Sequence, residues 1–221
     1  MVLAAVVALQ LAACGTPAMI AMALIPDGTL SIMMSHFERE SKVNRDQLAA
    51  LEKKGDWPGI ANFAEDNIAK DKLNAVWWMV AGHAYSRQGR HPRAIERYQE
   101  VVRLEPEVAE GYTLLAQEYR SNGESRRAVV LLTNAQYAVR ESAGMAFLLA
   151  ESHADLGAHE FAAKAYQQAI QLHGQFNEAW AGLALSYVRL GRVGEARGIA
   201  KSLTATRPDL AARVEREIAG Q

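Results

Sequence analysis

Residues 75–108 read AVWWMVAGHAYSRQGRHPRAIERYQEVVRLEPEV, and they form the clearest unit of a sequence repeat. Gly89 stands near its centre, and glycines recur at Gly123, Gly157 and Gly191, each 34 residues after the one before. A fixed period of this length is typical of repeat arrays, in which units of two helices stack on one another. The sequence therefore predicts an array of helix–turn–helix units.

Every unit repeats the same order of small and large residues. When Ala75 is taken as position 1, positions 8 and 20 hold glycine or alanine in four successive copies. We expect these small residues where the two helices of a unit approach most closely, because a bulkier side chain would force the backbones apart. Positions 4, 11 and 24 hold mostly large residues, which fill the space between helices. Glycine at position 15 suits a left-handed C-cap, and Pro106 stops the second helix of its unit.

The pattern from Trp78 to Pro106 resembles the tetratricopeptide repeat, whose signature is W-x2-L-G-x2-Y…A-x3-F…P. The resemblance implies an all-α fold, a right-handed α-solenoid of helix–turn–helix repeats that offers a curved surface to a partner. The chain departs from the signature at Ala81 in place of leucine, at His153 in place of tyrosine, and at Arg140 and Gly174 in place of the last proline.

The period divides residues 41–208 into five units, followed by a cap. Four units are clear, and the segment before them is expected to be a degenerate first repeat, because it keeps Gly55 but lacks the small residue at position 8. After the last unit, Leu210, Val214 and Ile218 recur every four residues, which predicts a capping helix. The expected boundaries are 41–74 for unit 1, 75–108 for unit 2, 109–142 for unit 3, 143–176 for unit 4, 177–208 for unit 5 and 209–221 for the cap.

Composition and motifs give no indication of catalysis or of nucleic-acid binding. The chain of 221 residues is 50% hydrophobic and 22% charged, as packed helical domains commonly are. Its formal net charge of −1 provides no broad basic surface for a nucleic acid. The six histidines show no metal-ligand spacing, and neither a phosphate-binding loop nor a nucleophile elbow is present. We therefore expect a protein that is not an enzyme and that carries no cofactor or metal, with His153 as a packed residue.

The N-terminal run from Met1 to Ala13 is apolar and ends in LAACG, with Cys14 the single cysteine of the chain. This arrangement resembles the lipobox of bacterial lipoproteins. The resemblance implies that residues 1–14 are a signal peptide ending at a lipidated Cys14, which would anchor the protein to a membrane. Because Gly15 rather than aspartate follows the cysteine, the resemblance also implies an outer-membrane location, with the repeats facing the periplasm.

Two features of this region leave alternatives open. The first basic residue is Arg39, although a secretory signal should begin with one, so either the translation start lies upstream or residues 1–25 are an uncleaved transmembrane anchor. Residues 15–40 form an apolar, methionine-rich linker or N-terminal helix. We expect residues 30–37 to form a helix packed on the first repeat; the alternative is a segment that docks a partner or fills the groove of the array.

In the tetratricopeptide repeat family the ligand usually lies in the concave groove lined by the first helix of each unit. The resemblance therefore implies a partner-binding groove whose N-terminal half is cationic and hydrogen-bonding, and whose C-terminal half is anionic and apolar. Such a mixed groove would orient an extended or helical peptide. The groove residues implied in this way are Met79, His83, Arg87, Thr113, Gln117, Arg120, Phe147, Glu151, Leu185 and Arg189.

Three functions follow from this layout. The first is a membrane-anchored scaffold or adaptor that binds a protein or peptide partner in its groove, for the assembly of an envelope or secretion complex. The second is a holdase-like periplasmic chaperone, which predicts many weakly bound clients. The third is a structural homo-oligomer without a groove ligand, in which the apolar segment of one chain caps another. The sequence does not identify the partner.

Overall fold

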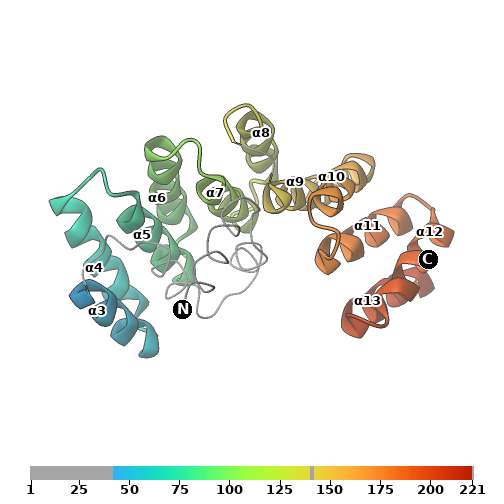
Figure 1. The fold of residues 1–221 in the computed structure, drawn as a ribbon, viewed down its shortest axis with the longest axis horizontal. Helices are drawn as coiled ribbons and strands as arrows, with labels where there is room; N and C mark the ends of the chain where they lie inside the picture. The colour runs from blue at the N-terminus through green and yellow to red at the C-terminus, as the bar shows by residue number, and fades with distance from the viewer. Residues whose placement is uncertain (1–41, 140–141, 221) are drawn as a thin grey trace, which may run out of the picture.

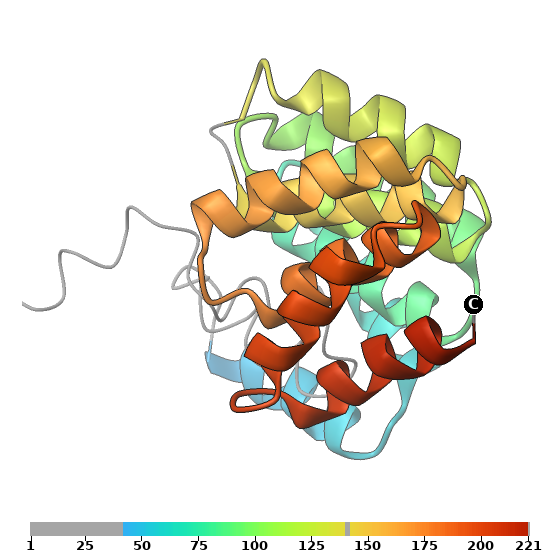
Figure 2. The ribbon, with the colours of Figure 1, turned by 90° about the vertical axis from the view of Figure 1, so that its right-hand side faces the viewer.

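The computed structural model describes residues 42–139 and 142–220, and in these two segments it contains eleven α-helices and no strand. Consecutive helix pairs follow one another along an arc, as Figure 1 shows, and Figure 2 gives the view at 90°. The helices are α3 (Lys42–Lys53), α4 (Trp57–Lys70), α5 (Ala75–Arg87), α6 (His91–Leu104), α7 (Ala109–Ser121), α8 (Ser125–Ala135), α9 (Ala143–Asp155), α10 (His159–Leu172), α11 (Asn177–Arg189), α12 (Val193–Leu203) and α13 (Pro208–Ala219).

These helices form the all-α repeat fold that the sequence predicts, with α3 and α4 as the first pair and α13 packed on α11 and α12 as the cap. The predictions for residues 1–14, for Cys14 and for the segment 15–40 fall outside the described residues. Among the helices of residues 42–139 and 142–220, none combines the length and the apolar character needed to cross a bilayer.

The turn inside each helix pair depends on a glycine in the left-handed region. The φ angles of these five glycines lie between +65° and +77°, at Gly55, Gly89, Gly123, Gly157 and Gly191. A side chain with a Cβ is strained in this conformation, so the glycine ends the first helix and redirects the chain into the second. The 34-residue period seen in the sequence is therefore the period of this turn.

The small residues at positions 8 and 20 lie at the closest approach of the two helices, as predicted. A Cβ added to Gly82 at position 8 would come within 2.6 Å of Cε1 of Tyr98. The alanines that occupy these positions in units 2 to 5 all have an exposed fraction of 0%: Ala94, Ala116, Ala128, Ala150, Ala162, Ala184 and Ala196. Their burial confirms the assignment of the repeat phase.

Neighbouring units are joined by hydrogen bonds from the ring at position 4. The indole of Trp78 donates to the carbonyl of Lys72 over 3.0 Å, and the indole of Trp180 donates to the carbonyl of Gly174 over 2.9 Å. The hydroxyl of Tyr112 reaches the carbonyl of the residue six before it, Pro106, at 2.9 Å. In each case the ring bonds to position 32 of the preceding unit.

A second hydrogen bond between units involves the tyrosine at position 11. The Tyr85 hydroxyl donates to Glu65 over 3.0 Å. At the later junctions a glutamine at position 25 of the preceding unit donates to the tyrosine hydroxyl, also over 3.0 Å: Gln99 to Tyr119 and Gln167 to Tyr187. The large residues at positions 4 and 11 thus connect units as well as filling space.

Among the described residues, neither bond is present at the junction between units 3 and 4. Position 4 of unit 4 is Ala146, which has no polar side-chain atom, and position 11 is His153. The His153 ring stacks instead on Phe161 of its own unit, with 5.4 Å between the ring centroids. Apolar packing of α8 and α7 against α9 remains at this junction, and ion pairs add to it.

Candidate functional site

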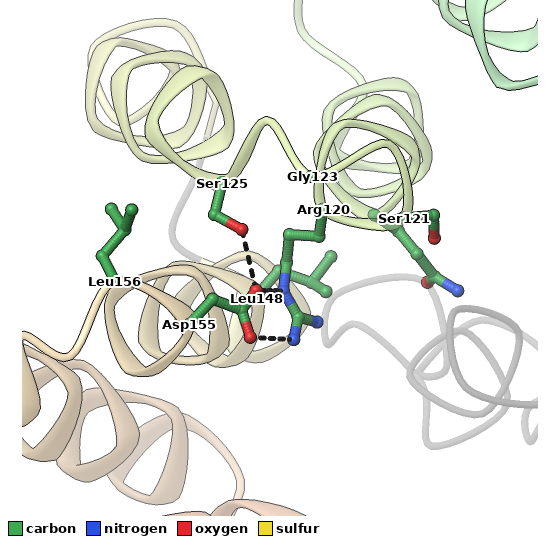
Figure 3. A pocket seen from close by; sticks show the side chains of 8 residues that line it. Arg120, Ser121, Gly123, Ser125, Leu148, Asp155 and Leu156 are labelled. Atoms are coloured by element: carbon green, nitrogen blue, oxygen red, sulfur yellow. Dashed lines mark hydrogen bonds and ion pairs between the residues drawn. The ribbon is translucent and has the colours of Figure 1, made fainter.

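A cluster of charged side chains joins α7 of unit 3 to α9 of unit 4. The guanidinium of Arg120 donates to Asp155 through Nε at 2.7 Å and through Nη2 at 3.2 Å, and Nη2 also reaches Glu151 at 3.0 Å. Ser125, the first residue of α8, donates to Asp155 over 2.9 Å, and Tyr166 donates to Glu151. Figure 3 shows the Arg120 and Ser125 side chains converging on Asp155.

The surroundings keep this cluster ionised. Burial by itself would raise the pKa of Asp155, but the hydrogen bonds from Arg120 and Ser125 outweigh it and hold that pKa below its ordinary value. Burial would lower the pKa of Arg120, yet its hydrogen bond to Asp155 and the charges of Glu151 and Asp155 raise it. Burial, together with the Glu151 charge, raises the pKa of Tyr166, so this hydroxyl remains a donor.

A cavity of about 560 Å³ lies beside the cluster. Gln117, Arg120 and Ser121 line it from α7, and Leu148 and Asp155 line it from α9. The Gln117 Oε1 atom is buried and accepts no hydrogen bond from the described residues. A buried amide oxygen without a donor is unfavourable, so this atom would favour an N–H or O–H group brought by a ligand.

Three side chains form a second cluster at the N-terminal end of the array. Trp57, the first residue of α4, meets the ring of His83 edge-on with 5.7 Å between centroids. The Arg87 guanidinium lies over the same indole, 4.6 Å from the ring centroid. Burial, assisted by the Arg87 charge, lowers the pKa of His83 to about 4. The His83 ring is therefore neutral near pH 7.

The structure separates the ten implied groove residues into different environments. Met79 and Phe147 belong to the core, and Phe147 packs against the rings of Tyr166 and Phe176 at 5.8 and 4.8 Å. Long apolar side chains at these positions turn inward because burial is favourable for them. A ligand would not reach them on the surface of the described residues.

The other implied residues are partly exposed, and several already have partners. The Thr113 hydroxyl donates to the Glu110 carbonyl over 2.9 Å. Leu185 is half-buried, and Arg189 pairs with Glu217 of the cap over 2.6 Å. The structure brings implied residues together in two places: His83 and Arg87 meet around Trp57, and Gln117, Arg120 and Glu151 lie at the junction of units 3 and 4.

This junction changes the expected charge pattern of the groove. Sequence reasoning assigns Arg120 to a cationic half and Glu151 to an anionic half, but the two side chains are bonded to each other. Asp155 pairs with the same arginine, so much of the charge at the centre is neutralised within the protein. Trp57 and Ser125, which the sequence interpretation does not include, complete the two clusters.

The histidines among the described residues occupy positions consistent with the repeat. His91 and His159 both begin the second helix of their units, as their shared position predicts. The His91 ring bonds to the buried carboxylate of Glu118 over 2.6 Å. Burial lowers the pKa of His153, which the sequence predicts to be a packed residue.

A family model described as tetratricopeptide repeat matches this chain over residues 79–123, 113–175 and 148–211, which together make up more than half of it. The chain belongs to the tetratricopeptide repeat (TPR) family. The protein bimA of Emericella nidulans is 30% identical to it over 70 residues. That match includes 32% of this TPR chain and 9% of bimA, so the chain spans less than a tenth of that relative.

Solved structures share the TPR fold along most of the chain. MamA is 22% identical with a TM-score of 0.64, and the match covers 82% of this chain and 99% of MamA. YrrB, described as a TPR protein with an unusual peptide-binding site, is 13% identical with a TM-score of 0.61, over 87% of this chain and all of YrrB (100%). At these identities the likeness concerns the fold.

Proposed function

We propose that this TPR protein is a membrane-tethered scaffold that holds a segment of a partner protein against the faces of α5, α7, α9 and α11. TPR proteins as a family bind protein or peptide partners, which supports the general class of function. The observation that carries the proposal is the polar cavity between α7 and α9, where Gln117 offers a buried amide oxygen without a donor among the described residues. A backbone or side-chain N–H of the partner would complete that hydrogen bond.

The pairing of Arg120 with Asp155 limits what the partner has to supply. Arg120 offsets one of the two carboxylates, so the cluster keeps one net negative charge, and a strongly charged segment gains little here beyond screened attraction. A partner that brings hydrogen-bond donors and modest charge fits the site better. Arg87 over Trp57 adds a cationic and aromatic contact at the N-terminal end of the same set of first helices.

Crosslinking in native membranes, read by mass spectrometry, tests the groove. The variant Gln117→Ala with Ser121→Ala alters two cavity-lining residues and leaves the Arg120 ion pairs in place. Arg126→Ala, an exposed change on the second helix of the same unit, is the matched control. We expect one partner to disappear with the double variant and to persist with the control. An unchanged partner list in both variants would reject the groove.

The membrane tether is part of the proposal and has its own test. The sequence around Cys14 supports lipidation, and Gly15 supports transfer to the outer membrane. Cells fed radiolabelled palmitate should label the wild type and should not label Cys14→Ala, which should also leave the membrane fraction. If Cys14→Ala is unlabelled but stays in the membrane fraction, the N-terminal residues themselves anchor the protein, and the proposal of anchoring by a lipid on Cys14 is wrong.

A further inference from the structure

An open cleft lies between α10 and α12, with α11 as its floor. Its volume is about 1050 Å³, which is in the range of ligand-binding pockets. Trp180, Leu183 and Tyr187 line it from α11. These residues stand at positions 4, 7 and 11 of their unit, not at the groove positions, so the cleft is separate from the cavity at Gln117.

The repeat itself shows why the cleft is open here. Trp78 occupies the same position in unit 2 as Trp180 does in unit 5. The Arg97 guanidinium lies 5.5 Å from the Trp78 ring centroid and is fixed by Glu65 at 2.7 Å. In unit 5 the residue equivalent to Arg97 is Ile199, which lines the cleft beside Trp180 without covering it with charge.

A glycine enlarges the same space. Position 22 holds Glu96, Val130 and Lys164 in units 2 to 4, but Gly198 in unit 5. A Cβ placed on Gly198 would meet no atom within 4 Å, so no close packing requires a glycine. Glycine inside a helix weakens it relative to alanine. Gly198 therefore destabilises α12 relative to alanine, and it leaves this part of the cleft wall without a side chain.

The walls combine polar and apolar side chains and carry little unpaired charge. Glu195 is the charged residue among those that line the cleft, and Arg192 donates two hydrogen bonds to its carboxylate, at 2.8 and 2.6 Å. Gln171 and Gln175 are exposed at the opposite wall. A side-chain amide offers one donor and one acceptor group, the same pair that a peptide bond presents. An apolar floor with amides above it suits a peptide more than an ion.

We propose that this cleft binds an extended, uncharged peptide segment of a partner protein, with a bulky apolar side chain against Trp180 and backbone amides bonded to Gln171 and Gln175. The length of α12, 11 residues, gives a cleft about 16 Å long. An extended chain rises about 3.3 Å per residue, so the cleft holds roughly five residues. The array then has two binding faces, one on the first helices and one between the second helices of its last units.

Selection from a peptide library tests this site without assuming a partner. Phage-displayed peptides of about seven residues, long enough to fill the cleft, are selected on the full-length protein. Enriched peptides are labelled with fluorescein, and their affinities are measured by fluorescence polarisation. Gly198→Lys fills the cleft with the residue that unit 4 has at this position. Gly194→Lys, on the same helix and equally free of neighbours, makes the same chemical change outside the cleft lining.

We expect uncharged peptides with a bulky apolar residue, bound at least about tenfold more weakly by Gly198→Lys and equally by Gly194→Lys. Equal binding to all three proteins, or enrichment of charged peptides, would overturn the proposal. Failure to enrich any peptide would do the same, and a change in oligomeric state caused by Gly198→Lys alone would assign the cleft to a second copy of the chain instead.

Discussion

Replacing Arg120 with methionine keeps an unbranched apolar side chain at this position and removes the guanidinium that joins α7 to α9. In the wild type this arginine makes two hydrogen bonds to Asp155 and one to Glu151, and its side chain is 20% exposed. Hydrogen bonds to charged groups contribute about 1.5–3 kcal/mol each when buried. Asp155 is 37% exposed, so solvent screening reduces its share, and we expect a coupling of about 1–2 kcal/mol between Arg120 and Asp155.

A double-mutant cycle of Arg120→Met and Asp155→Asn measures this coupling from urea unfolding midpoints and slopes. Because Ser125 also bonds Asp155, only the cycle separates the two contributions. The control is a cycle on Arg103 and Glu100, an exposed pair three residues apart on α6, for which we expect about 0.3 kcal/mol. A coupling between Arg120 and Asp155 no larger than that of the control pair would show that these ion pairs do not stabilise the junction.

Three further predictions concern the rest of the array. The pKa of His83 is about 4 in the folded protein and 6.5 in the unfolded chain, so the free energy of unfolding should fall by about 2 kcal/mol from pH 7 to pH 5. Urea titrations should show a smaller loss in His83→Gln. An equal dependence of the unfolding free energy on pH in both proteins would contradict this prediction. Gly182→Ala places a Cβ 2.3 Å from a buried tyrosine ring and should lower the thermal unfolding midpoint. Gly194→Ala has no such neighbour and should raise the midpoint, because alanine stabilises a helix by about 0.5–1 kcal/mol relative to glycine. An increase in the midpoint of both variants would disprove the close contact at Gly182. Ala128→Leu should destabilise by about 1–3 kcal/mol while the exposed change Arg126→Leu has little effect, and similar midpoints would reject the phase of the repeat.

The fold could be predicted because its signal repeats. One glycine in a 34-residue window has many explanations, but four in phase, with small residues at positions 8 and 20, have few. The capping helix expected at residues 209–221 follows from the same phase, and the structure has it at Pro208–Ala219. The prediction of the fold therefore rests on four copies of one pattern, and the structure agrees with it over the described units.

The site was harder to predict because it depends on how units stack. Arg120 bonds to residues 31 and 35 positions later, and that partnership is set by the offset between α7 and α9. Sequence position gave Met79 and Phe147 as groove residues, but their apolar side chains are buried. The sequence did contain one signal of contacts between units. Gln99 and Gln167 recur at position 25, and each donates a hydrogen bond to a tyrosine of the next unit.

The missing ring hydrogen bonds between units 3 and 4 have a mechanical consequence. In a stack whose units touch mainly their neighbours, tension applied at the two ends is carried by every junction in turn. Besides their apolar packing, three junctions have hydrogen bonds between a ring group and a carbonyl, an amide or a carboxylate. The junction between units 3 and 4 has the ion pairs of Arg120 in their place, and dissolved salt weakens those pairs. Stretched as a single molecule, the array should therefore part between Arg120 and Asp155 at a force that falls as ionic strength rises.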